Sequence, residues 1–399
     1  MRRTLARASF SGMNSMYIPF IIRGTAILVL LFIIPLEYLL DDTLSNEEVN
    51  LIESIQDMET SKLNTFFRGI TTTGTHYMVI ALLPFLYNFM DSVIVIKISI
   101  VICHALYLYS FTAILFTEPR PYWIHKSIKG INCEDGFGLP SEEILFGMVF
   151  YFYIIVEVFE SVHKQFKTLL YMLYTALLIL LAFSDMYLGE NFLHQIILTL
   201  CLGFVYITGV LLLDTYISNL ALMSTYYNNK NRTVQVYWFI ACMALLLIII
   251  TLSANVPSFD QPSIIWIKNS YKHCSFKQDI GGSYSFYQSG WIFFNAGAIF
   301  GSQLASRKVA VGWWRSKLHL KLFKGIVSSA VGFGIYFGFG FVETYDRTTE
   351  YAFNYVIPVS IGSFMCFGVM PIVFEKLKLN GQGTNSVYDS AGISLRELP

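Results

Sequence analysis

Charged residues are scarce in this chain of 399 residues: they make up 14% of it, against 55% hydrophobic residues, and the mean hydropathy is +0.55. This is too little charge for the surface of a soluble protein of this length, so we exclude a soluble globular domain. Lys+Arg and Asp+Glu balance at 27 each, so the net charge of +0 gives no indication of a nucleic-acid-binding protein. The composition indicates an integral membrane protein whose main partner is the lipid bilayer.

Cysteine is also sparse, since six residues are too few for a disulfide scaffold in a chain of this size. Four of them fall within apolar runs, where a small buried side chain is the usual role: Cys103, Cys201, Cys242 and Cys366. Cys133 and Cys274 lie in polar segments instead. They form a candidate disulfide if both segments face the oxidising side of a membrane.

Strands in which polar and apolar residues alternate one by one, which would indicate a β-barrel, are lacking, because the apolar runs are continuous. Runs near 20 residues predict membrane-spanning helices. The fold class is therefore all-α, a polytopic helical membrane protein with about ten transmembrane helices. The expected spans are 24–40, 75–91, 93–116, 141–162, 167–183, 193–213, 234–256, 287–305, 322–343 and 353–374.

The basic residues suggest how these spans are oriented. If the N terminus is cytosolic, the cytosolic segments hold 17 Lys and Arg residues and the opposite segments hold 9. This bias follows the positive-inside rule, and an even number of spans returns the C terminus to the cytosol. The polar stretches 111–143 and 184–195 then face the same, lumenal or exterior, side. Lys97, Glu157 and Glu160 lie near span ends, where snorkelling to the interface is expected.

These two stretches carry a resemblance to a known family. They contain Arg120-Pro-Tyr-Trp, Cys133-Glu-x-Gly-x-Gly-x-Pro-Ser141, and Ser184-Asp185 followed by Asn191 and Gln195. In spacing and order they resemble the motifs of the phosphatidic acid phosphatase type 2/haloperoxidase superfamily. Within that superfamily the chain is most similar to the glucose-6-phosphatase branch. The resemblance implies a six-helix phosphatase-like core with its site on the lumenal side, and the endoplasmic reticulum as the location.

The resemblance also shows what is missing. The family uses a histidine nucleophile, a second histidine as general acid, and a lysine and two arginines that bind the phosphate. At the nucleophile position this chain has Asn191, whose amide nitrogen cannot attack phosphorus because its lone pair is delocalised. The general acid is replaced by Glu143, the second arginine by Asp185 and the lysine by Ala113, so only Arg120 is kept among the cations. Acids in place of cations should repel phosphate.

We therefore predict a catalytically degenerate, glucose-6-phosphatase-like pseudoenzyme, with no competent catalytic residue and no cofactor. The vestigial pocket is expected to contain Arg120, Ser141, Glu142, Glu143, Ser184, Asp185, Asn191, His194 and Gln195. Structural roles are also expected: an ion pair from Arg120 to Asp185 or Glu143, a helix cap at Ser141, and a tight turn at Gly189. The role would be scaffolding, regulation or binding of a ligand other than phosphate, and a protein partner or a homo-oligomer is left open.

Three alternatives stay open. The acids Glu142, Glu143 and Asp185 could form a cluster that binds Ca²⁺ or Mg²⁺. The chain could be an active phosphomonoesterase on phosphorylated sugars or lipids that uses residues outside the family motifs, with His194 as the first candidate. A transporter is the third, although no pair of Gly/Pro-broken spans recommends it.

The expected organisation has five parts. A basic cytosolic segment, 1–23, precedes an extra transmembrane helix and a lumenal amphipathic segment, 24–59. A phosphatase-like membrane core follows at 60–215, and a four-helix extension at 216–374. A disordered cytosolic tail, 375–399, ends the chain.

Overall fold

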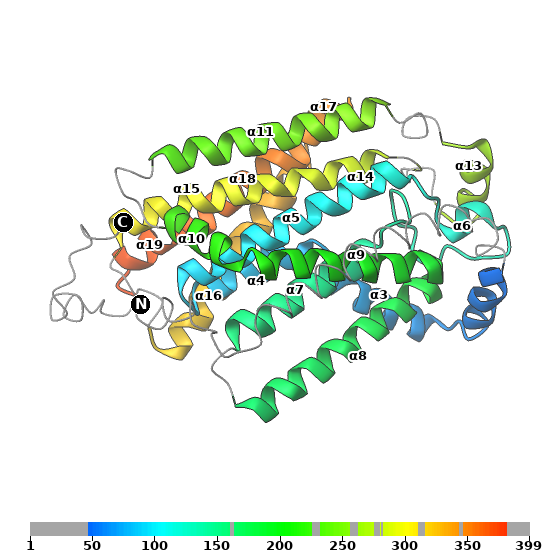
Figure 1. Ribbon diagram of the computed structural model, residues 1–399, viewed down its shortest axis with the longest axis horizontal. Helices are drawn as coiled ribbons and strands as arrows, with labels where there is room; N and C mark the ends of the chain where they lie inside the picture. The colour runs from blue at the N-terminus through cyan, green and yellow to red at the C-terminus, as the bar shows by residue number, and fades with distance from the viewer. Residues whose placement is uncertain are drawn as a thin grey trace.

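The protein is all-helical in the part that the computed structural model describes, which is residues 47–159, 163–225, 232–255, 262–274, 280, 282–309, 316–342 and 346–380. The expected N-terminal segment, the span at 24–40, Glu160 and residues 381–399 of the tail lie outside these residues. Figure 1 shows long helices running side by side along the longest axis. The expected fold class is confirmed.

Among the described residues, six segments are long and apolar enough to cross a membrane. They are Ser92–Ile124, containing α5 (Ser92–Phe116) and α6 (Pro121–Ile124); α8 (Lys164–Leu188); α9 (Leu193–Leu212); Gln235–Asn255 of α11 (Arg232–Asn255); α16 (Leu318–Phe339); and Thr348–Lys376. The last one combines most of α17 (Arg347–Glu350) with η4 (Tyr351–Val356), α18 (Ile357–Phe364), η5 (Met365–Val369) and α19 (Met370–Lys376).

The remaining expected spans are shorter helices: α4 (Tyr77–Tyr87), α7 (Glu142–Val158) and α15 (Ile292–Lys308). The other described elements with printed bounds are α3 (Ser61–Thr72), α10 (Asp214–Thr225), α13 (Ile264–Ser270), α14 (Ser283–Tyr287) and η3 (Gln288–Trp291). A helix also covers residues 47–56.

Helix α5 is the centre of the bundle, since 78% of its most apolar window is buried within the protein, compared with 6% for α8. α5 packs against α7, α10 and α15. Its Ser99 hydroxyl donates a 2.6 Å hydrogen bond to the Asn295 side chain on α15. On another face, α15 meets α18 and η5 through Gly297 and Gly301, where an added Cβ would collide with the opposing backbone. Small residues allow such close helix contact in a membrane protein.

Lys97 does not snorkel, contrary to expectation. It is 3% exposed, and its ammonium group lies 2.7 Å from a Glu157 carboxylate oxygen and 2.6 Å from one of Asp214. Glu157 is on α7 and Asp214 begins α10, so the three residues form an ion cluster at the interior face of α5. Buried charges are tolerated when they are paired in this way.

The two motif stretches meet at one end of the bundle, near α6 and α13 (Figure 1). Cys133 and Cys274 are joined there by a disulfide bond across 141 residues of chain. The helix at 47–56 packs onto the same end: Gln56 donates to the carbonyl oxygens of Lys129, at 2.8 Å, and Tyr187, at 3.2 Å. Ile52 on this helix is fully buried. Its apolar face therefore packs on the motif loops.

Candidate functional site

Arg120 precedes α6 and is 5% exposed. Its guanidinium donates hydrogen bonds to three backbone carbonyl oxygens: Gly136 at 3.0 Å, Asp135 at 3.0 Å and Glu190 at 3.4 Å. Within the described part of the chain, no ion pair joins it to Asp185 or Glu143, so the expected ion pair is wrong. Arg120 is used to hold the loop 134–138 and the start of the α8–α9 loop together.

Ser141 caps α7 as expected. Its hydroxyl accepts a 3.2 Å hydrogen bond from the backbone N–H of Ile144, and Glu142 and Glu143 occupy the first turn, where acids complement the positive end of the helix. The same hydroxyl lies 2.7 Å from an Asp185 carboxylate oxygen and 3.2 Å from one of Glu143. The cap therefore also links the first turn of α7 to the last turn of α8.

Glu142 and Glu143 are both 5% exposed, but they point to different neighbours. Glu142 accepts from the backbone N–H of His76 at 3.1 Å, and its carboxylate lies 2.6 Å from Nδ1 of the same histidine. The Tyr284 hydroxyl donates to its other oxygen at 3.4 Å. Successive residues on a helix differ by about 100° in direction, which separates the two carboxylates.

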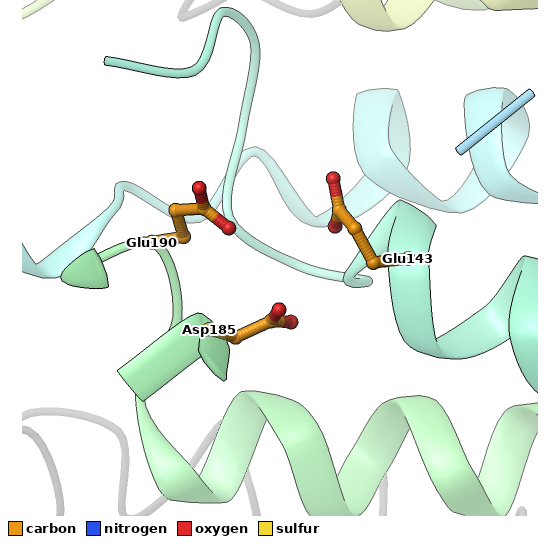
Figure 2. A group of neighbouring side chains, drawn as sticks. All are labelled: Glu143, Asp185 and Glu190. Carbon is orange, nitrogen blue, oxygen red and sulfur yellow. The ribbon is translucent and has the colours of Figure 1, made fainter. Parts of the chain in front are cut away.

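Glu143 meets Asp185 and Glu190 instead. One carboxylate oxygen from each of these three residues lies within 4.8 Å of the others, and Figure 2 shows the three groups pointing toward one another. Asp185 is in the last turn of α8, and Glu190 follows the turn at Gly189, whose φ of +79° is the left-handed conformation that glycine adopts readily. Asp185 and Glu190 are 0% exposed.

The carboxylates of Asp185 and Glu190 are only partly hydrogen-bonded. Asp185 Oδ2 accepts from Ser141, and Glu190 Oε1 accepts a 2.7 Å bond from the Asn132 side chain. Asp185 Oδ1 and Glu190 Oε2 have no hydrogen-bond partner among the described residues. Burial and the neighbouring carboxylates raise the pKa of Glu190 well above its ordinary value.

Asn191 lies beside this cluster and is 0% exposed. Its amide nitrogen donates to the carbonyl oxygen of Gly138, and its Oδ1 has no partner within the described chain. Gln195 accepts from the Phe192 backbone N–H at 3.1 Å and donates to Glu118 and to the Pro119 carbonyl oxygen. Both amides therefore tie the start of α9 to the loops around it.

Two predicted pocket residues are directed elsewhere. The Ser184 hydroxyl donates to Leu180 of its own helix at 2.7 Å. The Nδ1 atom of His194 lies 2.9 Å from a Glu48 carboxylate oxygen, and the backbone N–H of His194 also donates to Glu48. The His194 ring stacks on Phe192. These contacts fasten the helix at 47–56 to the start of α9.

Two residues of the site were missing from the predicted pocket. Glu190 lies between the predicted pocket residues Asp185 and Asn191. Its position directly after the turn at Gly189 and directly before Asn191 could have identified it. His76 is an isolated histidine 66 residues before its partner Glu142, and nothing in the sequence links the two.

The chemistry open to this arrangement follows from its donors. Three buried carboxylates, a serine hydroxyl and an asparagine amide supply oxygen ligands and negative charge, and the one arginine among them is committed to carbonyl oxygens. Such a set suits a cation or shared protons. It does not suit a phosphate dianion, which requires cationic or N–H donors.

Comparison with known proteins found a family match for part of the chain. Residues 94–219 match the family model of the PAP2 superfamily. The matched segment runs from α5 into α10 and contains every predicted pocket residue. Neither a comparison with curated proteins nor one with solved structures found a match. The chain is thus a transmembrane protein with a PAP2-like segment.

Proposed function

We propose that this chain is a membrane pseudophosphatase: it keeps the phosphatase-like fold of the PAP2 superfamily but has lost phosphate transfer. Its motifs are closest to those of the glucose-6-phosphatase branch. It serves as a scaffold, a regulator or a receptor for a ligand other than phosphate. We place it in the endoplasmic reticulum, with both termini cytosolic and the motif loops lumenal, on the distribution of Lys and Arg and on the family resemblance.

One observation carries this proposal: three buried carboxylates gather where the family binds its phosphate. Glu143 and Asp185 occupy the positions of the general acid and the second arginine, and Glu190 joins them. At an effective dielectric near 20, two like charges about 4 Å apart repel by roughly 4 kcal/mol. Several such contacts outweigh one arginine whose donors are already used by backbone carbonyls.

The nucleophile position supports the same conclusion. Asn191 has no basic lone pair, and its nitrogen is held by Gly138. His194, three residues after Asn191, directs its Nδ1 to Glu48. Glu48 lies on the helix at 47–56, which contributes no residue to the acidic cluster. Neither Asn191 nor His194 is arranged to attack a phosphorus atom beside that cluster.

The test is a phosphate-release assay on the purified full chain in detergent, with glucose 6-phosphate and phosphatidic acid as substrates. We expect no release above that of the Asn191→Ala variant, which reports contaminating phosphatases. His194→Ala and His76→Ala extend the test to the histidines outside the motif positions. Release by the wild type that either variant abolishes, or a phosphorylated protein intermediate trapped during turnover, would overturn the proposal in favour of an active phosphohydrolase.

A further inference from the structure

The cluster of Glu143, Asp185 and Glu190 is built from three separate segments. Glu143 is in the first turn of α7, Asp185 is in the last turn of α8, and Glu190 is in the loop before α9. In Figure 2 the three side chains extend from these segments toward one another. The described chain places like charges together here, where dispersing them would avoid repulsion.

The unpartnered oxygens are the second observation. Asp185 Oδ1 and Glu190 Oε2 belong to side chains that are 0% exposed, and neither accepts a hydrogen bond from the described residues. Figure 2 shows the Asp185 and Glu190 side chains extending toward each other and toward Glu143. Buried polar atoms in folded proteins nearly always have a partner, so two unpartnered carboxylate oxygens within one cluster indicate a ligand that carries positive charge.

The neighbouring donors do not balance the charge of the three acids. Ser141 can give its one proton to only one acid at a time, and Asn132 donates to the other oxygen of Glu190. Arg120 adds one positive charge nearby, but it donates its hydrogen bonds to carbonyl oxygens, and one charge does not balance three acids. Glu142, the remaining acid of the α7 turn, is occupied by His76.

We propose that Glu143, Asp185 and Glu190 bind a divalent, oxygen-preferring cation of the size of Ca²⁺. Ca²⁺ binds oxygens at 2.3–2.6 Å, so two of its ligands can lie up to about 5 Å apart, which accommodates the 4.8 Å limit within this cluster. Zinc is disfavoured because no histidine nitrogen or cysteine sulfur belongs to the group. The inference rests on the proposed function, because a cation ligand replaces phosphate at the same place.

The experiment is a titration of the full chain, purified in detergent after treatment with a chelator, with Ca²⁺ alone at pH 7.5. Isothermal titration calorimetry measures binding, and the thermal unfolding midpoint is followed against Ca²⁺ concentration. We expect one saturable site with a Kd below about 1 mM, the weak end of the range for protein Ca²⁺ sites, and a midpoint that rises with Ca²⁺.

Isosteric variants locate the site. Asp185→Asn and Glu190→Gln should each weaken binding at least tenfold, because each removes a charged ligand. Glu142→Gln is the matched control: it alters the neighbouring acid in the same helical turn, equally buried but directed at His76, so the Kd should stay within about twofold of the wild type. If Asp185→Asn fails to fold, the Glu190→Gln variant and the wild-type titration still decide the question.

The outcomes separate this inference from the proposed function. If the wild type binds no Ca²⁺, or if all three variants bind it as tightly as the wild type, the cluster does not hold the cation, and the inference is overturned while the loss of phosphatase activity stands. If Ca²⁺ binds and also switches on phosphate release that requires Asp185, the site is supported and the proposed function is overturned.

Discussion

A methyl group at Gly74 tests how the start of α7 is held in place. Gly74 lies in the turn between α3 and α4 and faces the backbone of Glu143. A Cβ added there would lie 2.6 Å from the Glu143 carbonyl oxygen, 2.8 Å from its Cα and 2.9 Å from its Cβ. We predict that Gly74→Ala destabilises the protein, because two of these three atoms are backbone and cannot rotate away.

The magnitude follows from the packing. Adding a methyl group to a filled site typically costs about 1–3 kcal/mol, since helices must separate or distort. Gly69 on α3 provides the matched control, because a Cβ there meets nothing within 4 Å. Gly69→Ala should stabilise the protein by about 0.5–1 kcal/mol, the usual gain of alanine over glycine in a helix. The two substitutions, five residues apart, should therefore have opposite signs.

Thermal unfolding of both variants and the wild type in one detergent measures the effect. The midpoint should fall for Gly74→Ala and rise for Gly69→Ala, by about 2–4 °C per kcal/mol or less, the sensitivity of domains of 150–250 residues. An unchanged or raised midpoint for Gly74→Ala would refute the close contact between the α3–α4 turn and Glu143.

Three further predictions follow from other parts of the structure. Burial raises the pKa of Glu190, so ionisation of its side chain opposes folding. Without a bound cation, the free energy of unfolding should therefore fall as the pH rises above about 4.3, the ordinary pKa of glutamate. Glu190→Gln should make this fall less steep when unfolding is measured at a series of pH values. Replacing Cys133 and Cys274 together with serine should lower stability by about 2–5 kcal/mol, measured by denaturation, and unchanged stability would contradict a structural role for the bond. Gly301→Ala should cost about 1–3 kcal/mol in the same assay, because its Cβ would lie 2.8 Å from the Gly368 backbone nitrogen, whereas Gly334→Ala, with nothing within 4 Å, should be neutral or stabilising.

The positions of the helices could be predicted from the apolar runs, but their neighbours could not. α5 and α8 are both 25 residues long and strongly apolar, yet one is central and the other is almost entirely at the surface of the bundle. A lipid chain and a neighbouring helix are equally apolar environments, so hydropathy does not distinguish them. For the same reason the sequence did not reveal that Lys97 points inward to Glu157.

The parts of the candidate site that depend only on residues close in sequence could be predicted. The cap at Ser141 and the turn at Gly189 depend on residues close in sequence, and both are confirmed. The predicted cation set contained Glu142, whereas the structure groups Glu143 and Asp185 with Glu190. Which of two adjacent acids faces the cluster depends on the rotation of α7 about its axis, and distant contacts such as that of His76 determine this rotation.

The cluster around Lys97 has a consequence for the order of synthesis. α5 emerges from the ribosome first, and Glu157 and Asp214 follow on helices made later. During that interval the Lys97 ammonium group, near the start of α5, lacks the carboxylates that pair with it in the folded protein, and an unpaired buried charge is costly. Lys97 must therefore stay in contact with water or headgroups until α7 is made, and its buried position is established only after Glu157 has been synthesised.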